Sequence, residues 1–319
     1  MPDSASLVIG TRGSALALWQ ARRIQQQLRD HGYDSTLQRI STRGDRVQDV
    51  PISEIGDEAV FTKELDRALL DERIDCAVHS LKDLPSRLPE GIALAAVGRR
   101  ASPFDAFVGH PNRSAVLQEL PEGALVATAS LRRRAQLLAW RPDLTVVPVR
   151  GNVDSRLETL AESDWHGMVL AVAGLKRLGR EDAIRSVIPA DIMVPAVGQG
   201  ALAITCRTAD SELRTLLRGT LHDPDTATAI TAERSFMKRI DGGCQVPTGA
   251  WARLNAEREL VIDGCVAALD GHTAFRIQKT APIDKAAAVG TELAQELLDA
   301  GGAAVLDAIR TPESSEHAE

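Results

Sequence analysis

Short apolar runs alternate with amphipathic segments along the first two thirds of the chain. Eight runs have the length and apolar character of strands: Leu7–Gly10, Thr36–Ser41, Cys76–His79, Ile92–Val97, Leu125–Ala129, Thr145–Val149, Met168–Ala171 and Ala201–Cys206. Helical spacing occupies the segments Ala15–Asp30, Thr62–Leu70, Leu131–Trp140, Asp154–Glu162 and Glu212–Leu217. This alternation predicts βαβ units in a mostly parallel sheet. Because the strands form one set before residue 100 and another after it, we expect two similar α/β lobes.

The pattern changes after Asp223. A helical segment, Thr226–Ile240, leads into a glycine-rich turn, and a last helical segment runs from Asp284 to Ala300. Three strand-like runs lie between them in meander order: Gly249–Leu254, Glu259–Ala268 and Thr273–Lys279. This order predicts a small α+β domain with a three-stranded antiparallel sheet. The polar tail TPESSEHAE is expected to be disordered.

Composition is that of an ordinary globular protein, with 319 residues, 44% of them hydrophobic and 25% charged. No apolar run approaches the roughly 20 residues that span a bilayer, and the start MPDSASLVIGTRGS does not read as a signal peptide. The four cysteines show no zinc spacing: Cys76, Cys206, Cys244 and Cys265. We therefore expect a reduced, cytoplasmic protein without a metal, in which Cys76, Cys206 and Cys265 are small core residues.

The net charge of −7 argues against bulk attraction to nucleic acid or a membrane surface. Basic residues nevertheless cluster at 132–134, at 150 with 156, and at 176–177. Local arginine clusters on an acidic chain suggest a small, highly anionic ligand held in a cleft. The alternative is a set of solvated helix faces, and we give Arg22, Arg23, Arg99 and Arg100 that interpretation.

Polar side chains follow the carboxyl ends of five predicted strands, where ligands bind in open α/β sheets. They are Arg12, Ser14, Ser80, Lys82, Asp83, Thr128, Ser130, Arg132, Arg133, Arg150, Arg156, Lys176 and Arg177. Arginine suits carboxylates because its planar fork binds both oxygens. The pattern predicts a polyanion site between the lobes. Asp83 is the exception among these cations, and it either pairs with a neighbouring base or handles protons and stabilises a ligand cation.

The turn Gly242-Gly243-Cys244-Gln245-Val246-Pro247 presents a thiol on flexible backbone. One interpretation is an attachment point, and the other is a buried, inert cysteine. A transient nucleophile needs a base, and no adjacent histidine supplies one. Phosphate-binding, zinc-protease and serine-hydrolase motifs are missing from the sequence. His79 lies within a strand-like run and is expected to be a satisfied core histidine.

Eleven segments, in order, resemble the porphobilinogen deaminases, a family also called hydroxymethylbilane synthases. They are TRGSALALWQ, STRGD, FTKEL, AVHSLKDLP, ATASLRRRAQL, RPDL, VRGNVDSRL, LAVAGLKRLG, PAVGQGAL, TAER and GGCQVPTGA. The resemblance covers nearly the whole chain. It implies two lobes like those of periplasmic solute-binding proteins, and a third domain. The division is then residues 1–100 with about 199–219, residues 101–198, residues 220–310, and a tail at 311–319.

The resemblance also implies a cofactor, dipyrromethane, attached to Cys244 by a thioether. It implies stepwise addition of four porphobilinogen molecules with loss of ammonia, then hydrolytic release of hydroxymethylbilane. A cytoplasmic monomer that passes its product to the next tetrapyrrole enzyme is expected. A non-catalytic anion-binding protein with the same two lobes is the competing hypothesis. That hypothesis explains the arginines but neither the Cys244 turn nor the third domain.

By the family pattern, Asp83 is the catalytic carboxylate that stabilises the cationic, substrate-derived electrophile. Cofactor contacts are implied for Cys244, Lys82, Thr128, Ser130, Arg132, Arg133, Arg150, Gln199 and Gly200. Substrate contacts are implied for Arg12, Ser14, Phe61, Arg156 and Arg177. One segment departs from the family, since Gly56-Asp57-Glu58-Ala59 stands where a GGKG loop is common, and Glu54 replaces a lysine. We assign no role to Glu54 or Glu58.

Overall fold

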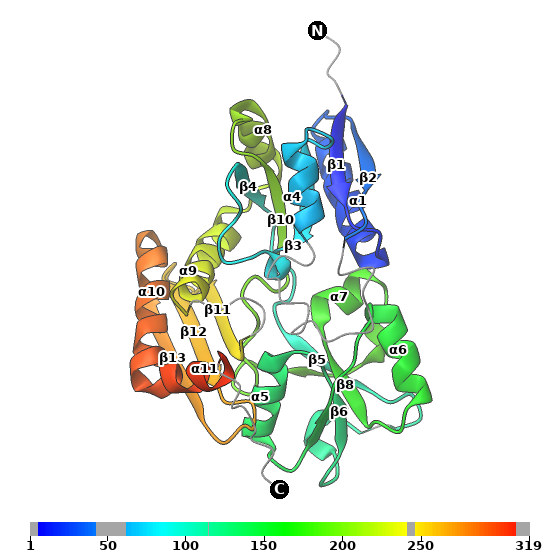
Figure 1. Ribbon diagram of the computed structural model, residues 1–319, viewed down its shortest axis with the longest axis vertical. Coiled ribbons are helices and arrows are strands. Elements are labelled where there is room, and N and C mark those ends of the chain that lie inside the picture. The colour runs from blue at the N-terminus through cyan, green and yellow to red at the C-terminus, as the bar shows by residue number, and fades with distance from the viewer. Residues whose placement is uncertain (1–5, 43–61, 114, 241–245, 311–319) are drawn as a thin grey trace, which may run out of the picture.

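The computed structural model describes residues 6–42, 62–113, 115–240 and 246–310. Two α/β lobes lie one above the other, and a third domain lies beside them (Figure 1). The fold class expected from the sequence, two similar α/β lobes with a small α+β domain, is confirmed. The described helices include none long and apolar enough to cross a membrane.

The first lobe is built on a five-stranded sheet with the order β2-β1-β3-β10-β4. Its strands are β1 (Leu7–Thr11), β2 (Ser35–Arg39), β3 (Cys76–Ser80), β4 (Ile92–Val97) and β10 (Leu202–Arg207). Helices α1 (Ala15–Asp30) and α8 (Ser211–Leu221) share one apolar cluster on the sheet, and α4 (Lys63–Leu70) contributes to another. The sheet is therefore covered on both faces. The side chain of Ser14 caps α1 by accepting from the Ala17 amide, which fixes where this helix begins.

The second lobe repeats this arrangement with the order β7-β6-β8-β5-β9. Its strands are β5 (Asp105–Gly109), β6 (Leu125–Ala127), β7 (Thr145–Val147), β8 (Gly167–Ala171) and β9 (Ile184–Ile188). Helix α5 (Leu131–Trp140) packs on one face, and α6 (Val153–Glu162) and α7 (Val172–Arg177) pack on the other. Strands β5 and β9 and helix α7 were not predicted from the apolar pattern.

The sheets are mostly parallel, as expected, but each contains one strand that runs opposite to the other four. In the first lobe β1 pairs in parallel with β2 and β3, whereas β10 is antiparallel to β3 and β4. In the second lobe β6 is parallel to β7 and β8, and β5 is antiparallel to β8 and β9. The reason is that the chain crosses between the lobes twice, at 98–104 and 189–201. A strand that begins at the crossing must run away from it, whereas β3 and β8 run towards it.

The third domain has a three-stranded antiparallel sheet, β11 (Thr248–Leu254), β12 (Leu260–Ala267) and β13 (Ala274–Ala281), as the meander pattern predicts. Helices α9 (Pro224–Ile240) and α10 (Ala286–Leu297) pack on it. Gly290 allows the two helices to approach closely, since a Cβ there would lie 2.0 Å from the Ala232 carbonyl oxygen. The last predicted helix, Asp284–Ala300, corresponds to α10. A further helix that was not predicted, α11 (Ala303–Arg310), follows Gly301, which has φ +122°.

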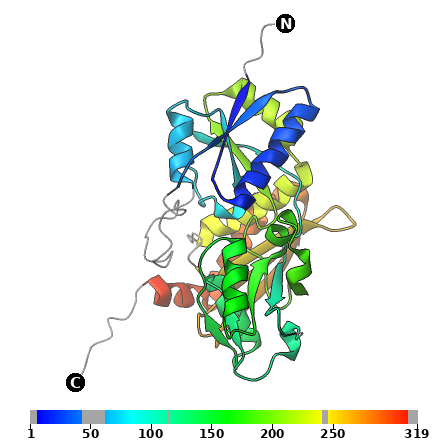
Figure 2. The ribbon, with the colours of Figure 1, turned by 90° about the vertical axis from the view of Figure 1, so that its right-hand side faces the viewer.

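A buried ion pair joins α9 to both crossing segments. Arg100 bonds to Glu233, whose side chain is fully buried, and Glu233 also accepts from the amides of Gly198 at 2.7 Å and Ala252 at 2.8 Å. Figure 2 shows α9, in yellow, at the level where the two lobes meet. The interpretation of Arg100 as part of a solvated helix face is therefore wrong, because its partner is distant in sequence.

We expect Glu233→Gln to destabilise the fold by about 3–5 kcal/mol, because the Arg100 charge would stay buried without its partner. The midpoint and slope of urea unfolding measure this. The matched control is Arg258→Gln, which removes an exposed pair between Arg258 and Asp225 on the same helix and should cost under about 1 kcal/mol. Equal effects of the two changes would contradict the role given to Glu233.

Candidate active site

Two pockets adjoin each other, the first lined by residues of the first lobe and the second lying where the two lobes meet. The first, called here the Asp83 pocket, is lined by Arg12, Ser14, Leu16, Ala17, Gln20, Thr62, Val78, His79, Ser80 and Asp83. The second, called the arginine pocket, is lined by Leu16, Ser80, Lys82, Arg133, Val153, Arg156, Leu170, Ala171, Ala173, Gly174, Arg177, Gln199, Gly200 and Ala201. Leu16 and Ser80 belong to both, so the pockets are neighbours. The second pocket takes residues from both lobes and from a crossing segment.

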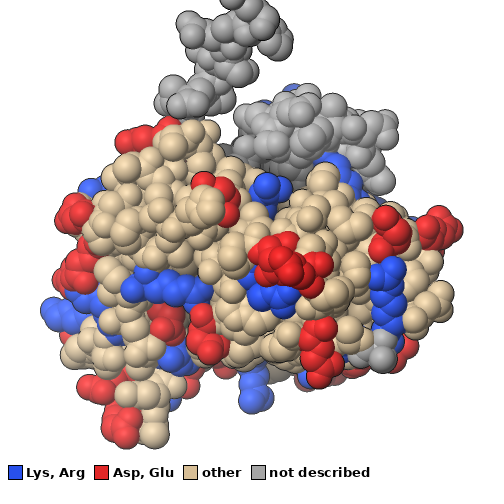
Figure 3. Space-filling view, turned by 90° about the horizontal axis from the view of Figure 1, so that it is seen from below, with Lys and Arg blue, Asp and Glu red and all other residues tan. Residues whose placement is uncertain are grey.

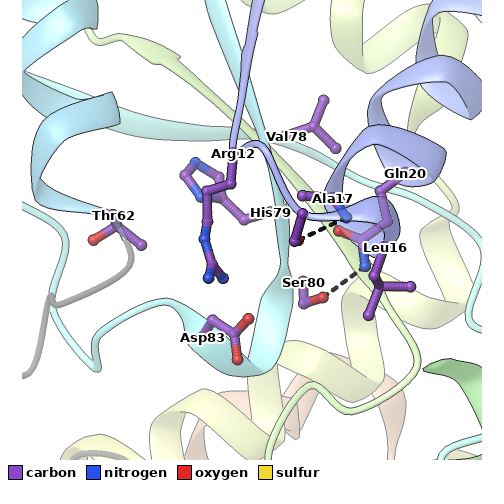
Figure 4. Close-up of a pocket in the computed structure, with 10 residues that line it drawn as sticks. Arg12, Leu16, Ala17, Gln20, Thr62, Val78, His79, Ser80 and Asp83 are labelled. Carbon is purple, nitrogen blue, oxygen red and sulfur yellow. Dashed lines mark hydrogen bonds between the residues drawn. The ribbon is translucent and has the colours of Figure 1, made fainter. Parts of the chain in front are cut away.

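The Asp83 pocket brings a carboxylate towards a guanidinium. Arg12 follows β1, and Asp83 ends the short 3₁₀ turn Leu81–Asp83 that follows β3. The Arg12 side chain points toward the Asp83 carboxylate (Figure 4). Asp83 is the only carboxylate among the residues described as lining the two pockets. A negative group placed among cations can accept a proton or stabilise a developing positive charge.

His79 is buried beside this pocket and its Nε2 lies 3.0 Å from the Thr205 hydroxyl. Burial, together with the nearby Arg12 charge, lowers the pKa of His79 to about 4. The imidazole is therefore neutral near pH 7. This agrees with the interpretation of His79 as a satisfied core histidine, although its position at the pocket wall was not expected.

The arginine pocket holds several cations with few carboxylates to balance them. Burial lowers the pKa of Arg156 to about 10, with Arg133 and Arg150 contributing, and burial lowers that of Arg177 to about 10. Within the described part of the chain, two guanidinium nitrogens are buried without a hydrogen-bond partner: Nε of Arg156, which lines the pocket, and Nη1 of Arg150, which does not line it but whose charge acts on Arg156. Buried donors normally have partners, so these guanidinium groups leave hydrogen-bonding capacity for an anion.

Arg177 also connects the lobes. Its Nη2 donates to the Gly200 carbonyl at 2.7 Å, and its guanidinium lies 5.7 Å from the ring centre of Trp19 on α1. Gly200 itself has φ +91°, and a Cβ there would lie 2.7 Å from the carbonyl oxygens of Ala101 and Ser102. Only glycine fits this close approach of the two crossing segments. The segments are therefore fixed against each other directly under the pocket.

Arg132 and Arg133 are buried and share a carboxylate, Asp105 at the start of β5, that sequence reasoning missed. Arg132 Nη2 and Arg133 Nη2 each lie 2.8 Å from an Asp105 oxygen. Burial alone would raise the pKa of Asp105, but the two arginines outweigh it and hold that pKa well below its usual range. Burial lowers the pKa of Arg132. The sequence signal that could have identified Asp105 as functional is that it is the one charged residue in the apolar run DAFVG.

A chain of hydrogen bonds runs from this ion pair to the first lobe. Gln199 Nε2 donates to Asp105 Oδ1 at 3.0 Å and to the Pro103 carbonyl at 2.7 Å, and Lys82 Nζ donates to Gln199 Oε1 at 3.3 Å. Burial lowers the pKa of Lys82 to about 8, helped by Arg133. The Lys82 side chain keeps some exposure at the pocket wall while protein surrounds it on other sides. Its charge is therefore the most easily lost in the pocket.

The remaining predicted site residues, Arg150 among them, do not line either pocket. Thr128 Oγ1 accepts from the Ser130 amide at 3.2 Å, and Ser130 Oγ caps α5 by accepting from the Arg133 amide at 3.4 Å. These two side chains shape the loop that presents Arg133. Arg132 lines neither pocket, because its guanidinium group donates hydrogen bonds to Asp105 and to the Val194 carbonyl. Cys244 and Phe61 lie outside the described residues, as do Glu54, Asp57 and Glu58.

The other three cysteines are free and buried, as expected for core residues. Burial raises the pKa of Cys76 to about 12 and that of Cys265 to about 11, and it raises the pKa of Cys206. They are therefore protonated thiols without nucleophilic character. Among the residues that the structure describes, no group of three or more His, Cys, Asp or Glu side chains is placed to hold a metal ion.

Charge on the face of the molecule seen from below (Figure 3) does not resemble charge in the pockets. In Figure 3, acidic and basic residues are interspersed over the face seen from below. That face therefore shows no broad basic patch of the kind that attracts nucleic acid. The concentrated positive charge instead lies between the lobes, where it suits a small anion that bears several carboxylates.

Comparison with known proteins gives consistent matches over nearly the whole chain. Residues 7–215 match the family model "Porphobilinogen deaminase, dipyromethane cofactor binding domain", and residues 227–299 match "Porphobilinogen deaminase, C-terminal domain". A porphobilinogen deaminase of Syntrophotalea carbinolica is 46% identical over 96% of this chain and 97% of that protein. One of Roseiflexus castenholzii is 48% identical over 94% of this chain and 98% of that protein.

Similar solved structures include the methionine-binding protein MetQ, with 12% identity, a TM-score of 0.42, and coverage of 67% of this chain and 89% of that one. The Escherichia coli periplasmic aliphatic sulphonate binding protein SsuA has 10% identity, a TM-score of 0.39, and coverage of 73% and 70%. We draw no argument from likenesses at this level.

Proposed function

We propose residue roles for this chain from the premise that it belongs to the porphobilinogen deaminase family. The protein is a transferase that joins four porphobilinogen molecules head to tail, with loss of ammonia, on a covalent dipyrromethane. Hydrolysis then releases hydroxymethylbilane for tetrapyrrole (haem) biosynthesis. The observation that supports these residue roles is that the Asp83 pocket adjoins the arginine pocket, since Leu16 and Ser80 line both.

The residues of the arginine pocket fit the dipyrromethane cofactor. When bound, this group supplies the pyrrole primer on which the chain is built, and each of its rings bears an acetate and a propionate. The unpartnered buried nitrogens of Arg150 and Arg156 are suited to such carboxylates. We assign cofactor binding to the residues that the family pattern marks: Lys82, Thr128, Ser130, Arg132, Arg133, Arg150, Gln199 and Gly200. Attachment is assigned to Cys244.

Asp83 is the catalytic residue we propose. When the carbon–nitrogen bond of the substrate aminomethyl group breaks, ammonia leaves and the methylene carbon becomes cationic. The Asp83 carboxylate stabilises this charge and is available to hold the proton that the next ring loses on bonding. Substrate carboxylates are assigned to Arg12, Ser14, Arg156 and Arg177, and an aromatic contact is assigned to Phe61.

The wider assignments are also proposals. We place the domain boundaries at residues 1–100 with about 199–219, 101–198 and 220–310, a division supported by the three separate sheets. The tail at 311–319 lies outside the described residues. We also propose a cytoplasmic monomer that hands its product to the next tetrapyrrole enzyme. Gel filtration tests the oligomeric state.

The assay that tests the function combines mass and product. The purified protein should exceed its chain mass by one dipyrromethane, react with Ehrlich's reagent, and release ammonia and hydroxymethylbilane when supplied with porphobilinogen. A protein of plain chain mass that binds porphobilinogen without releasing ammonia would instead be an anion-binding protein. That outcome would remove the enzymatic assignment.

We expect cofactor uptake by the cofactor-free protein to slow as pH rises through about 8. Lys82 has a pKa lowered to about 8, so its cation is present below that pH and lost above it, which weakens the attraction to carboxylates. Uptake rates measured from about pH 6.5 to about 9.5 report this loss. Lys82→Arg keeps the charge and should flatten the alkaline limb. An unchanged alkaline limb in Lys82→Arg would assign the titration to another group.

A further inference from the structure

The turn that carries Asp83 rests on a helix of the third domain. Asp83 ends the 3₁₀ turn Leu81–Asp83, and the Leu84 amide closes this turn by donating to the Leu81 carbonyl at 3.1 Å. Leu81 and Leu84 are each 1% exposed and share an apolar cluster with Ile230 of α9. Figure 2 shows α9, in yellow, beside the cyan segment that follows β3. The position of Asp83 therefore depends on how α9 packs against its turn.

Arg234 contacts the chain directly after this turn. It lies four residues after Ile230 on α9, and residues at this spacing share one face of a helix. Its Nη2 donates to the carbonyl oxygens of Pro85 and Ser86, each at 3.1 Å. These are the second and third residues after Asp83. One guanidinium nitrogen therefore fixes two successive peptide groups of the segment that leaves the turn.

The charge of Arg234 lies in a place that does not favour a charge. Burial lowers the pKa of Arg234, and its Nη1 is buried without a hydrogen-bond partner among the described residues. An uncharged side chain of similar length would occupy this space without the desolvation penalty. What the guanidinium adds, compared with such a side chain, is the pair of bonds to the segment after Asp83.

The Arg234 contact also links two parts of the site that are far apart in sequence. Helix α9 ends at Ile240, immediately before the segment that contains Cys244, the assigned attachment residue. The carbonyls that Arg234 binds lie 149 and 148 positions earlier in the chain. The domain that carries the attachment residue therefore also holds the backbone beside the proposed catalytic carboxylate.

We propose that Arg234 is a positioning residue that acts through Asp83: it fixes the backbone after the turn and so keeps the Asp83 carboxylate aimed into its pocket. The proposal rests on the catalytic role proposed above for Asp83. Arg234 is not among the residues that line either pocket. It therefore affects the rate of the bond-forming steps without contacting the substrate.

Steady-state kinetics of the cofactor-loaded enzyme test the proposal. Arg234→Met keeps an unbranched apolar stem and removes the donors, so it should keep the added mass, leave KM within about 2-fold and lower kcat about 10–100-fold. Arg234→Lys restores a cationic donor and should recover part of this loss. The matched control is Arg239→Met, since Arg239 lies on the same helix and donates to the exposed Gln295 side chain. Arg239→Met should leave kcat unchanged.

Two further measurements separate positioning from simple structural support. In an Asp83→Asn background, Arg234→Met should lower kcat by less than about 2-fold more, because no carboxylate is left to position. Amide hydrogen exchange reports the contact without turnover: the Leu84 amide should exchange faster in Arg234→Met than in the wild type, and at the wild-type rate in Arg239→Met. Thermal unfolding of each variant identifies losses that come from instability, and Arg234→Lys carries the same test if Arg234→Met does not fold.

Any of three results would overturn the proposal: an unchanged kcat in Arg234→Met, a raised KM with kcat intact, or losses that multiply in the double variant. The wild-type assay and Asp83→Asn separate these results from failure of the assigned reaction. A wild type that releases no ammonia contradicts the reaction itself, and a fully active Asp83→Asn contradicts the route through Asp83. An active wild type with an impaired Asp83→Asn and an unaffected Arg234→Met contradicts only the role of Arg234.

Discussion

Cys244→Ser is expected to be a folded, soluble protein that lacks the added mass of the cofactor and has no detectable turnover. The serine hydroxyl is far less acidic than a thiol, whose ordinary pKa is about 8.5, so it gives almost no anionic nucleophile near pH 7. Without attachment the chain has no covalent primer. Intact mass, Ehrlich's reagent and the porphobilinogen assay measure the loss.

The remaining cysteines serve as controls for Cys244→Ser. Cys76→Ala, Cys206→Ala and Cys265→Ala should keep the added mass and activity, because those thiols are buried and protonated. Their expected cost is a loss of stability from small core cavities. Normal turnover in Cys244→Ser, or loss of the added mass in one of the three controls, would refute the attachment assignment.

Asp83→Asn is expected to carry the cofactor and to lose turnover by roughly 10²–10⁴-fold, the range for charge stabilisation with acid–base catalysis. The amide keeps the shape of the side chain and removes its charge. The arginine pocket, which is lined by the assigned cofactor-binding residues Lys82, Arg133, Gln199 and Gly200, is not lined by Asp83. Intact mass should therefore be normal while kcat falls.

Asp83→Glu is the companion variant, because it keeps the charge and displaces it by one methylene. Asp83→Glu should lose less turnover than Asp83→Asn if the negative charge of the side chain matters more than its exact position. An exposed carboxylate on the same lobe, Asp71 at the end of α4, provides a control in Asp71→Asn, which should stay fully active. Near-normal kcat in Asp83→Asn would falsify the catalytic role.

The sequence by itself determined many of the local elements, although not β5, β9 or α7. Helices α1 and α5 have the predicted bounds, because each begins at a serine, Ser14 or Ser130, whose side chain accepts from an amide three residues later. β4 also has its predicted bounds. Caps and apolar spacing act over a few residues, so a linear reading reveals them. The same reading placed Arg12 and Asp83 at strand ends, and the structure brings them into one pocket.

The tertiary structure alone decided strand direction and the partners of the buried charges. Strands β5 and β10 are antiparallel because the chain enters each sheet from the opposite lobe, which no window of residues shows. Asp105 meets Gln199, and Gln20 meets Ser80, across 94 and 60 positions of sequence. Such pairs depend on how the lobes pack and not on local spacing. A buried polar group must find a partner wherever the fold places one, and only the folded chain shows where that is.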